Sequence, residues 1–478
     1  MGGWVGEGRV PGRPSADRPG PGRRIAERRR SRRTVLLAVG CLAVLGIAVP
    51  RLTDTGPGEA APPSRPVVTG SAPASGLPGG STTVPADGGI LGGRTRGSLA
   101  DDHAFVAGVR ALSWAPQPQQ PDDGFGYHPP DPPVETRSVV FAGEVSGDRW
   151  ALVVSRLPYG PGAGPGQLMA AWFAGSADAG PDEMTLRSGP NGIAPDWPIA
   201  ATDPRTGALV VVTYPGDVVE VSERPLIAAD GSTSRDWQEV ETVDGVAVTR
   251  VSPFARPYDG STSFRVLRGG RPAARDVPWS FDPGSLPTQP LTVEFPRGRP
   301  SELGERAARD AAGHVLDELG LSPAQVEITA QWVGSVPAGE AGQAAVVTVT
   351  LPSGAVVAQG EVLSPDRPDG ATTGAFCGQA ILPAGPPAGR RVEAMNCEVV
   401  DVTTGAPMSA SLVVVAPAEV ALIRTYDSER RFLSEHAAVD GILVVPLPLG
   451  TDTVEAVTAA GVTLGRVELL GRTVDFGD

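Results

Sequence analysis

The sequence contains no lysine, and all 40 of its basic residues are arginine. This absence excludes several enzyme mechanisms, because the Walker A phosphate loop, Schiff-base catalysis, protein kinases and the Ser-x-x-Lys acylation centre all need a lysine amine. The chain also lacks the HExxH zinc motif, a CxxC pair and the Gly-x-Ser-x-Gly nucleophile elbow. We therefore predict no cofactor and no metal site of a common type.

Histidine is also scarce. Any of the four could in principle act as a base beside a serine and an aspartate. Without a nucleophile motif, we interpret them as solvated or hydrogen-bonded side chains. Acidic residues are too numerous for a catalytic carboxylate pair to be recognised by spacing, so this chemistry stays open. The histidines are His103, His128, His314 and His436.

Charge is divided sharply along the chain. Residues 1–33 carry a net charge of +7, residues 51–478 carry a net charge of −21, and the whole chain carries −14. Such an acidic surface repels the phosphate backbone of nucleic acids. We therefore exclude DNA and RNA as partners of the large region.

Residues 34–50 contain no charged side chain and follow a dense run of arginines. Arginines at this position hold a preceding segment in the cytoplasm. We expect residues 34–50 to form a transmembrane helix in the lipid bilayer, with residues 1–33 as a disordered cytoplasmic tail. The segment is short for a span of ~17–25 residues, so a cleaved export signal and a lipoprotein signal at Cys41 stay open.

All three interpretations place the large region outside the cytoplasm. The expected localisation is the cell membrane, as a single-pass protein with a cytoplasmic N-terminus and an extracytoplasmic C-terminal region. Because Cys41 lies in the apolar segment, Cys377 and Cys397 are the remaining pair. In an exported chain this pair favours a disulfide, which would stabilise the fold by about 3 kcal/mol. A two-ligand metal site is the weaker interpretation, because no histidine lies near either cysteine.

Composition divides the remaining chain into a linker and folded regions. Residues 51–98 are rich in Pro, Gly, Ser and Thr and show no hydrophobic period, as is typical of a disordered linker. We predict a β-rich domain over 99–290, an α+β domain over 300–390 and a small β-sandwich-like domain over 391–478. The fold class is thus mainly β with minor α.

In the first folded region, Ser98 is a suitable cap for a short helix over residues 99–109. The Ser146-Gly147-Asp148 segment joins two apolar runs and predicts a β-hairpin. Many short strands punctuated by glycine and proline favour a sandwich or barrel. A partial propeller is the alternative, but we find no clear repeat of fixed period.

The second region begins with an amphipathic helix over residues 302–319. Ser301 is its expected N-cap and Gly320 its expected end. Apolar residues recur every three or four positions on one side, so this helix should lie on a sheet built from the strands that follow.

Tryptophan supplies the candidate binding residues. Six of the eight tryptophans fall in the first folded region. Trp150 and Trp172 lie within apolar strand runs and should be buried in the core. Trp197 and Trp279 lie beside prolines in predicted loops, so we propose them as ligand-binding residues on a glycan- or peptide-binding face.

The layout resembles uncharacterised single-span extracytoplasmic proteins of high-GC Gram-positive bacteria. The resemblance rests on the arginine-rich N-terminus, the linker and two segments, Phe141-Ala142-Gly143-Glu144 and Arg149-Trp150-Ala151-Leu152-Val153. It implies no known activity. From the sequence we hypothesise a membrane-tethered, non-enzymatic binding or interaction protein of the cell envelope with a glycan or protein partner. The alternative is an envelope glycan hydrolase that uses a carboxylate pair.

Overall fold

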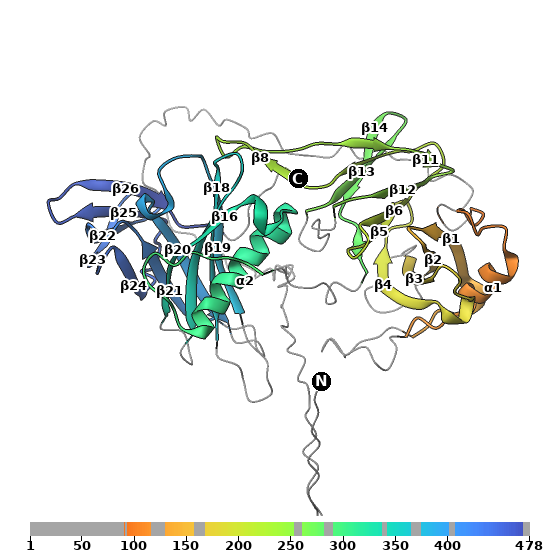
Figure 1. Cartoon of the computed structure of the whole chain (residues 1–478), viewed down its shortest axis with the longest axis horizontal. Coiled ribbons are helices and arrows are strands. Elements are labelled where there is room, and N and C mark those ends of the chain that lie inside the picture. The colour runs from red at the N-terminus through yellow and green to blue at the C-terminus, as the bar shows by residue number, and fades with distance from the viewer. Residues whose placement is uncertain are drawn as a thin grey trace, which may run out of the picture.

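The protein was analysed as a computed structural model, whose described part is mainly β. It contains 26 strands and two α-helices, which confirms a mainly β protein with minor α. The strands form two lobes that lie side by side, each beginning with one helix (Figure 1). The described residues are 90, 93–115, 130–156, 168–252, 261–281, 290–336, 342–364, 374–400 and 407–471.

The expected fold class and localisation need one correction. Within these described ranges, no helix is long enough and apolar enough to cross a membrane. Residues 34–50, to which the sequence assigned the transmembrane helix, lie outside the described residues, as do residues 1–33 and most of the linker.

The first lobe stacks helix α1 and three sheets. A hydrophobic cluster fills each gap between neighbouring layers, so α1 covers the helix-side sheet, the middle sheet follows, and the outer sheet comes last. The helix is α1 (His103–Ala111). The helix-side sheet contains β1 (Arg137–Val145), β2 (Asp148–Arg156), β3 (Leu168–Ser176) and β4 (Thr185–Ile193). The middle sheet contains β5 (Ile199–Asp203), β6 (Ala208–Val212), β11 (Thr242–Val243), β12 (Val246–Arg250) and β15 (Trp279–Ser280), and the outer sheet contains β7 (Val218–Ser222), β10 (Gln238–Val240), β13 (Ser263–Arg268) and β14 (Arg271–Asp276).

The second lobe has the same layers in the same order. Helix α2 (Glu302–Leu319) covers its helix-side sheet, and two further clusters join that sheet to a middle and an outer sheet. The helix-side sheet contains β16 (Glu327–Ser335), β17 (Gln343–Thr350), β18 (Val356–Leu363) and β19 (Gly374–Leu382). The middle sheet contains β20 (Glu393–Val400), β21 (Pro407–Val415) and β24 (Ile442–Pro446), and the outer sheet contains β22 (Val420–Tyr426), β23 (Phe432–Ala437), β25 (Thr453–Thr458) and β26 (Thr463–Glu468).

Strand order shows that the two lobes share one topology. The orders β1-β2-β3-β4, β12-β6-β5 and β10-β7-β13-β14 in the first lobe match β16-β17-β18-β19, β24-β21-β20 and β23-β22-β25-β26 in the second. Before each helix, a short segment also pairs in parallel with the first strand, at Arg96 with Phe141 and at Glu294 with Thr329. The chain therefore contains the same fold twice, as a first repeat (residues 90–281) and a second repeat (residues 290–471).

An arginine clamp occurs in both repeats, although Arg297 lies three residues after Glu294, the residue that corresponds to Arg96 by strand pairing. The Arg96 guanidinium donates to the carbonyl oxygens of Thr213 and Asp244, at 2.5 and 3.4 Å. The Arg297 guanidinium donates to the carbonyl oxygens of Ala416 and Asp440, both at 2.6 Å. In each case the arginine precedes the helix and joins the end of one middle-sheet strand to the turn before another.

The turns that these arginines hold are alike in sequence and conformation. Asp244-Gly245 and Asp440-Gly441 both have positive φ, at 51° and 74° in the first and 51° and 76° in the second. A Cβ on Gly245 or Gly441 would lie within 2.5 Å of a carbonyl oxygen, so only glycine fits there. The sequence carries Val-Asp-Gly once in each repeat, 196 residues apart, whereas the equivalent residues Phe141 and Thr329 are 188 residues apart, so the period is not constant along the chain.

An extra hairpin in the first repeat accounts for the irregular spacing. Strands β8 (Pro225–Ile227) and β9 (Thr233–Arg235) have no counterpart among the described strands of the second repeat. The hairpin extends toward the other lobe (Figure 1). There the Ala384 N–H donates to the Ala229 carbonyl at 2.7 Å, and Ile227 packs beside the core under α2. The insertion thus ties the two repeats together.

Several local predictions are confirmed. Helix α2 has Ser301 as N-cap and left-handed Gly320 at its end, and β1 and β2 form the predicted hairpin around Ser146 and Gly147. Cys377 of β19 and Cys397 of β20 form a disulfide, which joins the helix-side and middle sheets of the second repeat.

The predicted start of the first helix was wrong. Helix α1 begins at His103, and the Asp102 carboxylate caps it by accepting from the Phe105 N–H. Ser98 instead accepts from the Glu144 N–H, and the Leu99 N–H donates to the Ala142 carbonyl. The segment before the helix is therefore held along β1 and is not available for a helical turn.

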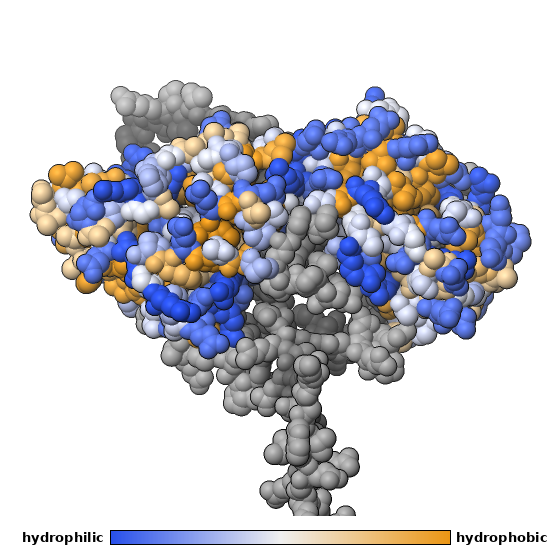
Figure 2. Space-filling model, viewed as in Figure 1, coloured by the Kyte–Doolittle hydropathy of each residue, from blue (hydrophilic) through white to orange (hydrophobic). Residues whose placement is uncertain are grey.

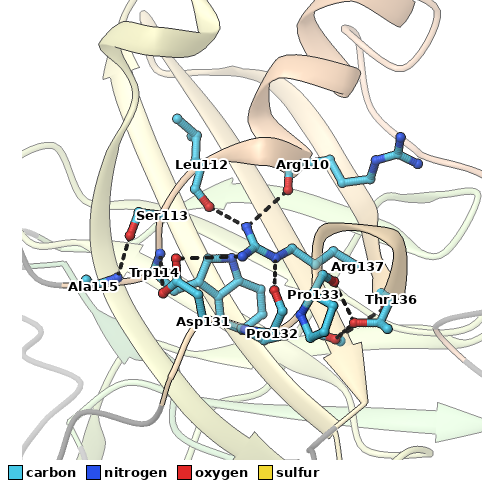
Figure 3. A network of polar contacts seen from close by, with 11 residues as sticks. Arg110, Leu112, Ser113, Trp114, Ala115, Asp131, Pro132, Pro133, Thr136 and Arg137 are labelled. Carbon is cyan, nitrogen blue, oxygen red and sulfur yellow. Dashed lines mark hydrogen bonds and ion pairs between the residues drawn. The ribbon is translucent and has the colours of Figure 1, made fainter.

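A buried arginine fixes the other end of α1 (Figure 3). The Arg137 guanidinium donates to the carbonyl oxygens of Arg110, Leu112 and Pro132 and lies over the Trp114 ring. Arg137 is only 5% exposed, and burial lowers the pKa of its guanidinium despite the nearby Asp131 carboxylate. One side chain thus satisfies carbonyls at the C-terminal end of a helix, where they lack helical partners.

We expect Arg137→Met to lower the free energy of unfolding by about 3 kcal/mol, because it leaves buried carbonyls without donors. Urea unfolding measures this loss. Arg110→Met is the matched control, since its side chain is exposed and its carbonyl stays in place. Equal stability of the two variants would contradict the role assigned to Arg137.

Candidate functional site

Trp197 and Trp279, the two residues proposed from sequence, line one cavity of about 290 Å³. Trp197 lies in the loop between β4 and β5, whereas Trp279 lies in β15 at the edge of the middle sheet. The two tryptophans are more than eighty residues apart in sequence. They lie close together because β15 pairs with β5, where Trp279 is opposite Ala201. We call this cavity the tryptophan pocket, lined by Gly192, Ile193, Ala194, Trp197, Pro198, Ala200, Phe264, Asp276, Val277 and Trp279.

Both tryptophans are half-buried, and each packs against a different core. Trp279 contacts the cluster between the helix-side and middle sheets, and Trp197 contacts the cluster between the middle and outer sheets. Phe264 is only 1% exposed and belongs to the second of these clusters. The cores therefore hold the rings in place and leave part of each ring toward the cavity.

Asp276 is the one carboxylate among the ten lining residues. Its Oδ2 accepts from the Trp197 indole N–H at 2.7 Å, and its Oδ1 accepts from the Val277 N–H at 2.9 Å. Within the described residues, no arginine or histidine forms a salt bridge with Asp276. The site therefore contains a carboxylate oriented by two N–H donors and balanced by no described cation.

Sequence reasoning missed Asp276. The residue lies three positions before Trp279, but its hydrogen-bond partner Trp197 is 79 residues away. Only the pairing of β5 with β15 and of β13 with β14 brings these groups together. In the sequence alone, an aspartate close to a proline–tryptophan pair is only a weak indication of a binding residue.

The second repeat builds the equivalent place differently. By strand register, Ala200, Phe264 and Asp276 correspond to Ala394, Val454 and Val467. Ala394, Val454 and Val467 belong to one hydrophobic cluster with Val392 and Leu469. The fold can therefore close this position with aliphatic side chains, and the aromatic and acidic residues of the first repeat are not demanded by the architecture.

The histidines lie apart from the pocket. His103 is the exposed first residue of α1, and His128 lies outside the described residues. The His436 Nε2 is 2.8 Å from the Ser434 Oγ on β23. The His314 Nδ1 on α2 is 3.1 Å from the Glu361 carboxylate on β18.

Asp310 and Glu361, two acidic residues next to His314, are the closest match to a catalytic carboxylate pair. The pKa of Asp310 is raised to about 6, mainly by burial and then by the charge of Glu361. These groups lie between α2 and β18 and do not line the tryptophan pocket. Among the described residues, no group of three or more His, Cys, Asp or Glu side chains is placed to hold a metal ion.

Hydrophobic residues also gather at the outer end of the second lobe, near β25 and β26 (Figure 2). Val462 is 56% exposed and Leu464 is 42% exposed there. These side chains project from a hairpin, and neither lines the tryptophan pocket. The tryptophan pocket is therefore the better-formed candidate site.

Comparison with known proteins adds little. No family model and no curated protein matches the chain. Among solved structures, the native conformation of E. coli alpha-2-macroglobulin is similar over 67% of this chain and 26% of that protein, with 12% sequence identity and a TM-score of 0.12. The chain thus spans about a quarter of that protein's length, and this likeness carries no argument about fold or function.

Burial makes one acid of the second repeat sensitive to pH. Glu393 is 3% exposed, and burial raises its pKa to about 7 despite the nearby Arg391. Because the pKa in the folded state lies above the ordinary glutamate value of 4.5, the folded state binds more protons than the unfolded state between pH 4.5 and 7. Stability should therefore fall as pH rises through this window, by about 3 kcal/mol.

We expect Glu393→Gln to remove this loss. Urea unfolding at pH 8 should show the variant to be more stable than the wild type, whereas the two should be alike at pH 4.5. The exposed Glu468→Gln variant serves as control and should behave as the wild type does at both pH values. If the free energy of unfolding of Glu393→Gln differed from that of the wild type by the same amount at both pH values, the raised pKa of Glu393 would be contradicted.

Proposed function

We propose that this protein is a non-enzymatic ligand-binding protein and that the tryptophan pocket is its binding site. The observation that carries the proposal is the contrast between the repeats. The first repeat places Trp197, Trp279, Phe264 and Asp276 around a cavity, whereas the second repeat has Val454 and Val467 in one hydrophobic cluster at the positions of Phe264 and Asp276.

The composition of the pocket suits binding. Ligand sites are concave and mainly apolar, with few polar groups that fix orientation. Here two indole rings and Phe264 provide aromatic surface, and Asp276 is the one charged side chain of the lining. Tryptophan offers large contact area at little cost in side-chain freedom, so it is common at binding sites.

The size of the pocket limits what enters it. At about 290 Å³ it lies near the lower end of the ~300–1,000 Å³ usual for small-molecule sites. We therefore infer that it takes a small molecule or one projecting group of a larger glycan or protein partner.

A glycan hydrolase stays the alternative. The observation in its favour is the raised pKa of Asp310 beside Glu361, since perturbed carboxyl groups often serve in catalysis. Release of sugar fragments from wall glycans, lost in the Asp310→Asn variant, would support this alternative over binding alone.

Thermal unfolding of the whole protein against a panel of small amines, acids, sugars and short peptides tests the proposed function. A ligand at about 100 times its Kd should stabilise the folded protein by about 2.7 kcal/mol. We expect at least one compound to raise the Tm of the wild type but not of the Trp197→Ala/Trp279→Ala variant.

Trp237→Ala is the matched control. Trp237 is also half-buried in the first repeat, but it lies beside Arg265 and Arg275 on the outer sheet, away from the pocket lining. This variant should keep the response. Stabilisation that persists in the double variant, or no stabilisation by any compound, would count against the pocket as the binding site.

A further inference from the structure

We propose that the tryptophan pocket receives an alkylammonium group, with Asp276 as its counter-ion. The inference rests on the proposed function and adds the chemical class of the bound group. It starts from the state of the Asp276 carboxylate, which is half-buried at the wall of the cavity.

The carboxylate is oriented but not neutralised. An ionised carboxylate has about four acceptor positions on its two oxygens. Two of them are used, by the Trp197 indole N–H and by the Val277 N–H. Since neither donor carries a formal charge and no described residue forms an ion pair with Asp276, the negative charge stays available to a ligand.

The aromatic residues favour the same kind of ligand. The face of an indole ring is electron-rich and attracts cations, and tryptophan does so more strongly than tyrosine or phenylalanine. Two tryptophans and Phe264 line the cavity together with Asp276. A cationic group in this cavity would meet aromatic rings and a carboxylate at once.

The side chains of the lining favour a cation over a neutral sugar as the inserted group. Apart from Asp276 and the two indoles, they are all aliphatic or aromatic hydrocarbon, or glycine, so a sugar would have to pair most of its hydroxyl groups with the backbone. An alkylammonium group needs one counter-ion, which Asp276 supplies, and contact with carbon surface, which the indole rings supply.

The charge of the protein acts in the same direction. The chain carries a net charge of −14, and the exposed Asp196 directly precedes Trp197. A protein of net negative charge attracts cations and raises their rate of encounter. Anionic ligands would be repelled by the same charge.

A matched pair of probes tests the role of charge. Choline carries a trimethylammonium group, and 3,3-dimethylbutan-1-ol has the same shape with carbon in place of the charged nitrogen. We expect the N-methyl proton resonance of choline to move upfield on titration with the whole protein, because the methyl groups would lie against indole faces. The neutral alcohol should bind about tenfold more weakly or not at all.

Variants locate the site. Asp276→Asn keeps an acceptor for the Trp197 indole and removes the charge, so choline affinity should fall by about tenfold or more. Asp236→Asn, an exposed acid of the same repeat, should leave the affinity unchanged. If Asp276→Asn alters folding, Trp197→Phe provides a second test, since it retains a ring but reduces the attraction for a cation.

The same titration distinguishes the two sources of an ammonium group. Tighter binding of choline indicates a free small molecule, and tighter binding of a peptide that carries lysine or trimethyllysine indicates a protein-borne side chain. Either result supports the inference.

Equal binding of choline and its neutral analogue would overturn the inference, as would no binding at about 10 mM of any ammonium probe. A different compound that needs Trp197 and Trp279 would then still support the proposed function. Failure of the ammonium inference can therefore be distinguished from failure of the proposed binding function.

Discussion

The fold depends on a guanidinium group that joins two backbone carbonyls where the chain passes between sheets. Arg96 provides this group in the first repeat and Arg297 provides it in the second. The carbonyls belong to the residue that follows a strand and to an Asp-Gly turn with a left-handed backbone. Arg96 is buried, where a carbonyl without a donor is costly, whereas Arg297 and Asp440 are exposed. The joint presence of the arginine and the turn in both lobes is the strongest sign that one fold occurs twice.

Once the framework is seen as duplicated, each repeat serves as a reference for the other. Positions that the architecture requires are alike in both, as at the Asp-Gly turns. Positions that differ in chemical character are free of that requirement. The pocket residues Phe264 and Asp276 correspond to Val454 and Val467 of the second repeat. The contrast separates a candidate site from the packing that surrounds it, in a chain for which no family model supplies such a contrast.

Local features were predictable from the sequence because neighbouring residues determine them. The caps of α2 and the β1–β2 hairpin follow from short-range patterns, and the Cys377–Cys397 disulfide was expected because these are the two cysteines outside the apolar segment. The start of α1 was wrong because Ser98 and Leu99 bond to β1, more than forty residues away. The transmembrane helix was assigned to residues outside the described part, and the described part contains no candidate.

The repeat and the site needed information over longer distances. Insertions such as the β8–β9 hairpin make the separation between equivalent residues of the two repeats differ along the chain, so one fixed period does not describe them. Trp197 and Trp279 were identified from their proline neighbours. Asp276 was not identified, because its role depends on a hydrogen bond from the Trp197 indole, which lies in the distant loop between β4 and β5.

The central claim is that ligand binding belongs to the first repeat and not to its counterpart. Fluorine NMR of the whole protein labelled with 5-fluorotryptophan tests it most directly, with signals assigned by single Trp→Phe variants and choline as the probe. The account predicts that the signals of Trp197 and Trp279 shift on titration, while that of Trp332 in the second repeat stays in place. A shift at Trp332 with none at Trp197 and Trp279 would contradict the account.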